Sequence, residues 1–261
     1  MILSYTVIFF VLGLIIGSFL NVLIFRLNTK RSLGGRSACM SCQKKLFWYE
    51  LVPLVSFLTL RGRCRSCKVK ISIQYPVVEL VTGFIFAILF LKFQNLFFKD
   101  ILFFLIAYIY YTVLSSIFLV IAVYDFKHKI IPDRLVLIFG AMGFMGLFFS
   151  GFSFYIPTIL EFLSGIFVAS PFALLWLVSG GRWMGLGDAK LAVPISWLLG
   201  FSGALSALVV AFWSGAVVGV ALVILSRRTC KLGMKSEIPF APFLVFGVFL
   251  TIIFNLNLFG F

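Results

Sequence analysis

The chain has 261 residues, of which 62% are hydrophobic and only 11% are charged, and its mean hydropathy is +1.17. Most of such a chain cannot be the surface of a soluble domain, so the composition excludes a globular cytosolic protein and indicates an integral membrane protein. The formal net charge of +14 would suit a nucleic-acid partner. However, no basic patch interleaved with stacking aromatic residues lies outside the loops between apolar runs, and we expect no nucleic-acid binding.

Eight apolar runs can be drawn as crossings of a hydrocarbon layer, which takes about 20 helical residues. They lie at roughly 4–25, 75–92, 101–124, 134–150, 156–179, 189–200, 203–226 and 240–258. The stretch 189–226 is too long for one crossing and contains GFSG at 200–203, which favours a tight hairpin over the alternative of one long tilted helix. We therefore expect an all-α integral membrane protein with about eight transmembrane helices.

The first run, within residues 1–26, is not expected to be a cleaved signal peptide. Positive charge follows its apolar stretch and does not precede it, which is the reverse of a secretory signal. Its GLIIG sequence places Gly13 and Gly17 four residues apart, a small-residue pair typical of close helix packing.

The basic residues indicate the orientation. With the N-terminus outside, 20 of the 22 Lys and Arg residues fall in inward loops, and only Lys92 and Lys99 fall outside. Adding or dropping one crossing would scatter these charges, so the positive-inside rule supports both the orientation and the number of crossings.

The loop 27–74 follows the first helix and contains the cysteine pairs CMSC and CRSC. Their residues are Cys39, Cys42, Cys64 and Cys67. Two such pairs suit a tetrahedral zinc site, to which each pair contributes two thiolates from a tight turn. Disulfides are disfavoured because cytoplasmic thiols stay reduced, while metal-free or redox-active thiols remain an alternative. Four thiolates leave no open coordination position, so the zinc would be structural; Cys230 has no partner at metal-ligand spacing.

Two of the eight acidic residues stand at ends of apolar runs. Asp125 closes the third run in VYDFKHKIIPD, and Asp188 opens the sixth in GLGD. The 62 residues between them would form one out-and-back hairpin, which returns both aspartates to the same membrane face. Two carboxyl groups in a partly dehydrated site can share a proton and activate water, as in aspartic proteases. Alternatively, Asp188 is an ordinary helix cap, and Asp125 pairs with Lys127 or Lys129.

Further motifs follow one another along the chain. They are GSFLNVLIFR at 17–26, ELVPLVSFLTLRGRC at 50–64, QYPVVEL at 74–80, DFKHKIIPD at 125–133, GLGDAK at 185–190 and IPFAPFL at 238–244. With the paired cysteines, their order and spacing resemble the bacterial type IV prepilin peptidases of the GxGD aspartic-protease group, nearly from end to end. One departure is Met40, where members of the family often have proline.

The resemblance implies removal of the short basic leader from type IV prepilins or pseudopilins, with Asp125 and Asp188 as the catalytic pair. It places the enzyme in the bacterial cytoplasmic (inner) membrane, with both aspartates on the cytoplasmic side. It also implies N-methylation of the new N-terminus, with S-adenosylmethionine as donor, by the cysteine loop and its surroundings, including Gly62 and Glu79. The chain would then comprise a first transmembrane helix at 1–26, a methyl-transfer loop at 27–74 and a transmembrane peptidase domain at 75–261.

Two other classes of function remain open at this stage. In a proton-coupled transporter the two aspartates would line a proton path, although both lie at the membrane edge and no repeat of broken helices is evident. In a non-enzymatic pilus or secretion assembly protein, the zinc loop would dock a partner. The sequence assigns no residue to S-adenosylmethionine and indicates no oligomeric state.

Overall fold

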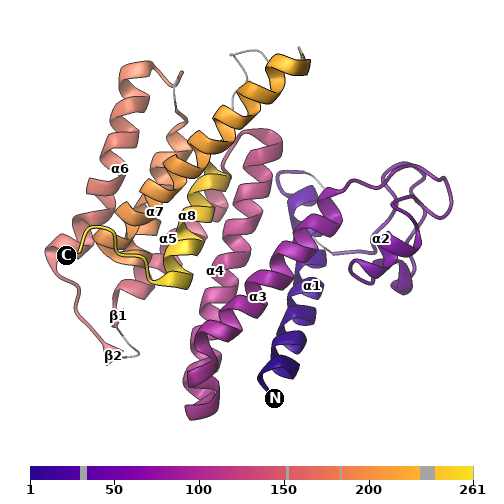
Figure 1. Ribbon diagram of the computed structural model, residues 1–261, viewed down its shortest axis with the longest axis horizontal. Helices are drawn as coiled ribbons and strands as arrows, with labels where there is room; N and C mark the ends of the chain where they lie inside the picture. Colours follow the sequence, from indigo (N-terminus) through magenta and orange to yellow (C-terminus); the bar gives the residue numbers. More distant parts are fainter. Residues whose placement is uncertain (30–33, 151–152, 183, 230–238, 261) are drawn as a thin grey trace. The chain divides into compact units, whose positions relative to one another are not determined.

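The computed structural model describes residues 1–29, 34–150, 153–182, 184–229 and 239–260 (Figure 1). The expectations for Cys230 and for the acid Glu237 lie outside these residues. The chain divides into two compact units, Met1–Val120 and Ile121–Phe261, and each is described by itself. Both units are mainly helical.

The first unit is built on a pair of long helices, α1 (Ile2–Arg26) and α3 (Gln74–Lys99). The small-residue pair of α1 packs against α3, which confirms the prediction from GLIIG. A Cβ atom on Gly13 would lie 2.7 Å from the carbonyl oxygen of Thr82, and one on Gly17 would lie 2.8 Å from the Cα atom of Glu79. Because these neighbours are backbone atoms, a larger residue would force the two helices apart.

Between α1 and α3 lies a loop with two short helical turns, η1 (Trp48–Leu51) and α2 (Val55–Thr59). The unit continues into α4 (Ile101–His128), which extends beyond the unit's last residue. At the turn before α4, Asp100 Oδ1 accepts hydrogen bonds from the backbone N–H groups of Leu102 and Phe103, at 3.0 and 3.2 Å. Asp100 is therefore a helix cap.

The described part of the second unit contains four further helices and two short paired strands. Their bounds are α5 (Asp133–Leu147), β1 (Phe149–Ser150), β2 (Ser153–Phe154), α6 (Ile159–Ser179), α7 (Leu186–Thr229) and α8 (Ala241–Phe254). The strands pair antiparallel, with Phe149 opposite Phe154. The sequence analysis missed these strands because it extended the fourth apolar run through residue 150.

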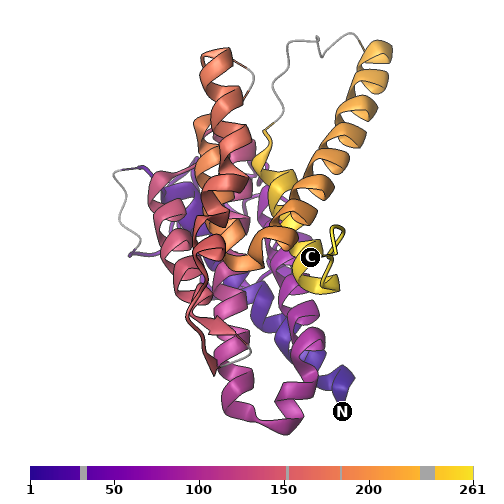
Figure 2. The same ribbon diagram turned by 90° about the vertical axis from the view of Figure 1, so that its left-hand side faces the viewer.

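Helix α7 is interrupted within the stretch where the sequence predicted a break. Gly200 has φ 72° and ψ 171°, and helical segments lie on both sides of it. The chain changes direction there (Figure 2). Glycine adopts this backbone conformation readily because it lacks a Cβ atom. The non-helical part is the single residue Gly200, the first of the four residues GFSG at which the sequence predicted the break.

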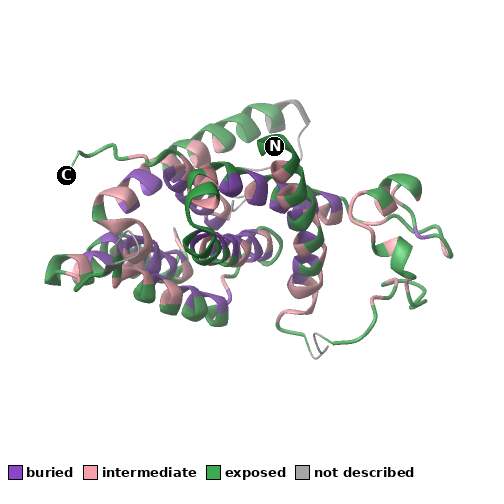
Figure 3. Cartoon of the chain, turned by 90° about the horizontal axis from the view of Figure 1, so that it is seen from below, coloured by how far each residue is buried: buried purple, intermediate pink, exposed green. Residues whose placement is uncertain are grey.

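Within the described residues, five helices are long and apolar enough to cross a membrane: α1, α3, α4, α6 and α7, the last counted over Leu186–Leu225. Helix α8 is apolar but shorter. Exposed residues run along the outer sides of the helices (Figure 3). Many of them are large and hydrophobic, which suits surfaces in contact with lipid. The protein is therefore a multi-pass membrane protein with an all-helical membrane part.

Candidate active site and cysteine cluster

Asp125 and Asp188 lie in the second unit, where their two helices end and begin. Asp125 stands in the last turn of α4, which continues to His128, and Asp188 is the third residue of α7. Both side chains are buried, with exposed fractions of 6% and 7%. The Asp125 carboxyl group lies within range of electrostatic interaction with Asp188. The fold thus brings together two acids that are separated by 62 intervening residues in the chain.

The two carboxyl groups have different hydrogen-bond environments. Asp125 accepts a hydrogen bond from the backbone N–H of Ala241, the first residue of α8. Asp188 Oδ1 is buried and has no hydrogen-bond partner among the described residues. Leaving a buried acceptor unpaired costs about 1–3 kcal/mol, which an ordinary N-cap does not explain. The oxygen is available to a water molecule or a substrate group.

The donor to Asp125 was missed by sequence reasoning, although IPFAPFL was noted as a motif. Its signal is the proline in the first turn of α8, since proline is favoured at the first positions of a helix. A helix start carries backbone N–H groups without intrahelical partners, and these attract a carboxylate.

The chain that follows Asp125 contacts one residue before Asp188 and one residue after it. A Cβ atom on Gly187 would lie only 3.1 Å from the Cβ and Cδ1 atoms of Ile131. Two residues beyond Asp188, the Lys190 ammonium lies 2.7 Å from Asp133 Oδ1. These two contacts join the residues around Asp188 to the connection that follows α4; the ion pair is exposed and contributes little, so the packing of Gly187 against Ile131 is the closer constraint.

Gly185 leaves space beside the Asp188 carboxyl group. Among the described residues, a Cβ atom at this position would meet no atom closer than 3.9 Å, and one of its two nearest neighbours is Asp188 Oδ2, at 4.0 Å. A side chain there would cover the carboxylate, whereas glycine leaves room for an approaching backbone. The two glycines of GLGD therefore have different surroundings, since Gly187 is packed against Ile131 and Gly185 has space beside the Asp188 carboxyl group.

The cysteines of the first unit form a cluster that can hold a metal ion. The Sγ atoms of all four lie within 4.8 Å of one another, and the Sγ atoms of Cys39 and Cys67 are 3.8 Å apart. A tetrahedral site with Zn–S bonds of about 2.3 Å has sulfur atoms about 3.8 Å apart. The geometry and the chemistry of the donors therefore fit a tetrathiolate metal site.

The two cysteine pairs adopt the same turn. The Cys39 N–H donates to the Lys44 carbonyl at 3.0 Å, and the Cys64 N–H donates to the Val69 carbonyl at 2.9 Å. The fourth residue after the first cysteine of each pair, Gln43 or Lys68, is left-handed, with φ 54° and 58°. The pair containing Met40 thus keeps the turn geometry of the other pair.

Charge in the cluster is distributed unevenly. Hydrogen bonds from the backbone N–H groups of Cys67 and Ser66 lower the pKa of the Cys64 thiol to about 6. For Cys67, the Val69 N–H acts in the same direction, but burial and the neighbouring cysteines outweigh it and raise the pKa to about 11. Four thiolates this close repel one another, and a divalent cation would remove that repulsion.

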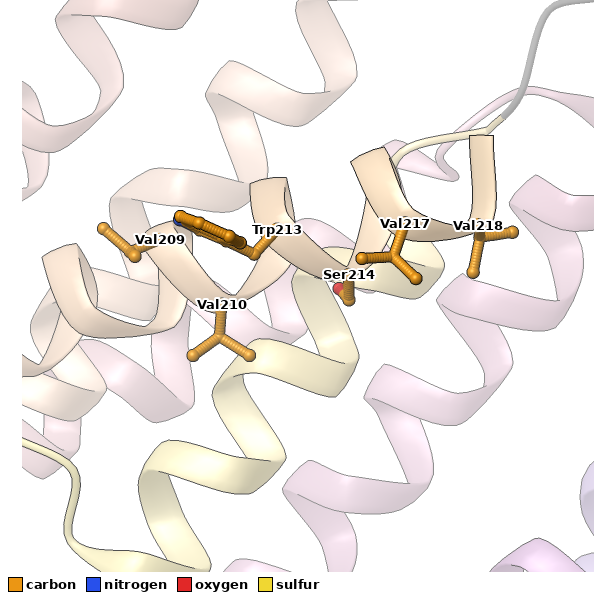
Figure 4. A pocket seen from close by; sticks show the side chains of 6 residues that line it. All are labelled: Val209, Val210, Trp213, Ser214, Val217 and Val218. Carbon is orange, nitrogen blue, oxygen red and sulfur yellow. The ribbon is translucent and has the colours of Figure 1, made fainter. Parts of the chain in front are cut away.

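A groove along the second segment of α7 carries no candidate site residue. It is lined by Val209, Val210, Trp213, Ser214, Val217 and Val218 (Figure 4). The only hydroxyl group in the lining donates to the carbonyl oxygen of Ala211, at 3.1 Å. The groove has the character of a lipid-facing surface.

Comparison with known proteins agrees with this arrangement. Residues 11–93 match the Bacterial Peptidase A24 N-terminal domain, and residues 112–220 match the Type IV leader peptidase family. A prepilin leader peptidase/N-methyltransferase of Bacillus subtilis is 30% identical over 97% of this chain and 96% of its own length. The chain belongs to the type IV leader peptidase family. This membership confirms the resemblance inferred from the motifs.

Other members of the family are similar over most of the chain. The prepilin leader peptidase/N-methyltransferase of Myxococcus xanthus is 32% identical, over 89% of this chain and 67% of that protein. The one from Pseudomonas aeruginosa is 29% identical, over 94% and 88%. No solved structure matches the chain significantly. The N-terminal match contains the four cysteines, and the leader peptidase match contains both aspartates.

Buried acids are rare among the described residues of this family member. Only Glu79, Asp125 and Asp188 are buried. Glu79 Oε2 accepts a hydrogen bond from the Leu54 N–H at 2.9 Å, and Glu161 takes part in the capping box of α6. Glu79 therefore anchors the cysteine loop to α3. The aspartate pair remains as the acidic site of the second unit.

Proposed function

We propose that the protein cleaves the leader peptide from type IV prepilins or pseudopilins and N-methylates the new N-terminal residue. The observation that carries this proposal is the buried aspartate pair within the part that matches the leader peptidase family. The names of the relatives include both activities. Membership of this family does not favour a proton-coupled transporter or a non-enzymatic assembly protein.

In the proposed cleavage step, Asp125 and Asp188 share one proton. The ionised carboxylate takes a proton from a water molecule, whose oxygen attacks the scissile peptide carbonyl. The protonated carboxyl group gives its proton to the carbonyl oxygen, which forms a neutral tetrahedral intermediate. The intermediate then collapses and its C–N bond breaks. The leaving nitrogen receives the proton that one carboxylate took from water, and the other carboxylate takes a proton back from a hydroxyl group of the intermediate. The unpartnered Asp188 Oδ1 offers an acceptor for the water, and the space at Gly185 admits the substrate backbone.

For the methyl-transfer activity we assign the loop 27–74, with S-adenosylmethionine as methyl donor. Cys39, Cys42, Cys64 and Cys67 would hold Zn²⁺ as a closed structural site. The new N-terminal amine must lose a proton before its nitrogen can accept a methyl group. Because four thiolates leave no open coordination position on the metal, the zinc would organise the loop and would take no direct part in the transfer.

We also propose eight crossings, with the N-terminus outside and the aspartates at the cytoplasmic face of the inner membrane. Helices α1, α3, α4, α5, α6 and α8 and the two segments of α7 would supply these crossings. The distribution of Lys and Arg supports this orientation. Residues 1–26 would be the first transmembrane helix and 75–261 the peptidase domain, with prepilins and membrane lipid as partners.

The test of the function is a mass measurement on a purified prepilin mixed with the purified protein in lipid. We expect the prepilin to lose the mass of its leader. With S-adenosylmethionine present, the product should gain the mass of one methyl group. An unchanged prepilin mass, from protein that retains its helical content, would refute the cleavage activity.

The contact between Gly187 and Ile131 gives a prediction about the position of the aspartates. We expect Gly187→Ala to lower kcat/KM for prepilin by about 10- to 100-fold, because its methyl group would displace Asp188 by a fraction of an ångström. Adding Ile131→Ala should restore part of the loss, since it removes the Cδ1 and Cγ1 atoms that crowd the new methyl group and leaves only the Ile131 Cβ position at 3.1 Å.

The matched control is Gly140→Ala in α5, where a Cβ atom would meet nothing within 4 Å. This variant should cleave at the wild-type rate. If Gly187→Ala and Ile131→Ala simply multiply their separate losses in the double variant, the contact does not position Asp188.

A further inference from the structure

The loop between α1 and α3 exposes far more hydrophobic surface than it buries. Among the described residues 34–73, Cys64 alone is buried, while nine large hydrophobic side chains are exposed. Six of the nine lie in the segment 47–58, which contains η1 and α2. They are Phe47, Trp48, Tyr49, Leu51, Val55 and Leu58. Hydrophobic surface gathered in this way indicates an interaction with a partner or a membrane.

The segment 47–58 is held beside the membrane-spanning helices of its own unit. Helices α1 and α3 flank the loop, and α2 lies to one side of them (Figure 1). The hydrogen bond from the Leu54 N–H to Glu79 attaches the segment to α3. Glu79 is five residues into α3, about 7.5 Å along the helix axis. The segment is therefore held near the depth of the headgroup region and cannot extend freely into the cytoplasm.

The charge of the loop favours anionic lipid. Residues 34–73 contain eight Lys and Arg residues and a single acid, Glu50. The Arg65 guanidinium donates to the Tyr49 hydroxyl at 2.7 Å and lies over the Tyr49 ring, so positive charge is placed directly beside the exposed aromatic residues. Basic side chains beside exposed Trp, Tyr and Phe are typical of segments that lie in a membrane interface.

The same charge disfavours the basic leader of a prepilin as the occupant of this surface. A positively charged leader would be repelled by the eight basic residues, whereas anionic headgroups would be attracted. The loop is also joined at both ends to helices long and apolar enough to span a membrane, α1 and α3, so a bilayer surface would lie next to it.

We propose that the segment 47–58 lies in the headgroup region of the cytoplasmic leaflet, with its hydrophobic side chains directed toward the acyl chains and the basic cysteine turns against anionic headgroups. If the proposed function holds, this arrangement keeps the methyl-transfer loop at the membrane surface. The new N-terminus of a cleaved substrate would also lie there, because it directly precedes an apolar segment embedded in the membrane.

Trp48 provides a direct test, because its side chain is 77% exposed. The full protein is placed in nanodiscs that contain phosphatidylglycerol, with and without bromine atoms near the headgroup end of the acyl chains. The emission of Trp48 is obtained as the difference between the wild type and Trp48→Phe. Trp213, which is 72% exposed on the membrane-spanning helix α7, serves as the lipid-contact control through Trp213→Phe.

We expect brominated lipid to quench Trp48 to an extent comparable with Trp213, and we expect weaker quenching in nanodiscs of phosphatidylcholine alone. Trp48 emission that brominated lipid does not quench in either kind of nanodisc would overturn the proposal. Trp48 emission that changes only after prepilin is added would also overturn it. Unchanged metal content of Trp48→Phe shows that the loop remains folded. The readout needs no cleavage or methyl transfer, so its failure is distinguishable from failure of the proposed function.

Discussion

Replacing either aspartate of the pair by asparagine is expected to lower the kcat for prepilin cleavage by about 10³-fold or more, which is within the range of general acid–base catalysis. Asparagine keeps the size of the side chain but cannot take a proton from water or deliver one to the carbonyl oxygen. KM should change little, because asparagine keeps the size and shape of the side chain. Product mass and initial rates at saturating prepilin provide the measurement.

The matched control for Asp125→Asn and Asp188→Asn is Asp100→Asn. Asp100 caps α4 through its side-chain oxygen, and asparagine caps a helix about as well as aspartate. This variant should cleave at the wild-type rate. If either Asp125→Asn or Asp188→Asn retained near wild-type cleavage, the shared-proton mechanism would be wrong and that aspartate would have a structural role.

Methyl transfer separates loss of catalysis from loss of folding in these variants. A pilin that already lacks its leader should still be methylated by Asp188→Asn at close to the wild-type rate, since the cysteine loop lies in the first unit. Loss of both activities would instead indicate that the buried asparagine disrupts the fold.

Local sequence signals predicted much of the architecture. Apolar runs give the membrane-spanning helices because hydrocarbon requires an uninterrupted hydrophobic segment with satisfied backbone groups. The spacing of Gly13 and Gly17 predicted their packing, and the two CxxC pairs predicted a cluster of four thiols. Each of these features depends either on residues that are close in the sequence or on two motifs that residue type and spacing identify.

The missed features depend on contacts between distant segments. The hydrogen bond from Ala241 to Asp125 uses a backbone N–H, which no residue type identifies. The Ile131–Gly187 contact requires the connection between α4 and α5 to meet the start of α7. The exposure of segment 47–58 follows from the absence of a covering element among the described residues of the first unit. Glu79 could be linked to the cysteine loop only by resemblance, while its hydrogen bond to Leu54 required the fold.

The cysteine cluster yields the other prediction of large effect. We expect the purified protein to contain one zinc ion per chain and Cys64→Ser to contain almost none. Binding of structural zinc contributes about 10–16 kcal/mol in zinc-finger peptides, and the described loop has no other buried side chain to replace that contribution. Elemental analysis after gel filtration in lipid provides the measurement, with Cys230→Ser as the matched serine variant that keeps its zinc.

Loss of the metal should separate the two proposed activities. Without zinc the loop loses its folded structure, so Cys64→Ser should not methylate a pilin. Its rate of leader cleavage should remain within a few-fold of the wild type, because Asp125, Asp188, Ile131 and Gly187 all belong to the second unit. If Cys64→Ser bound zinc normally, the tetrathiolate site would be wrong. If it lost zinc and cleavage together, the folding of the second unit would depend on the loop, since a closed site of four thiolates has no coordination position at which to activate water.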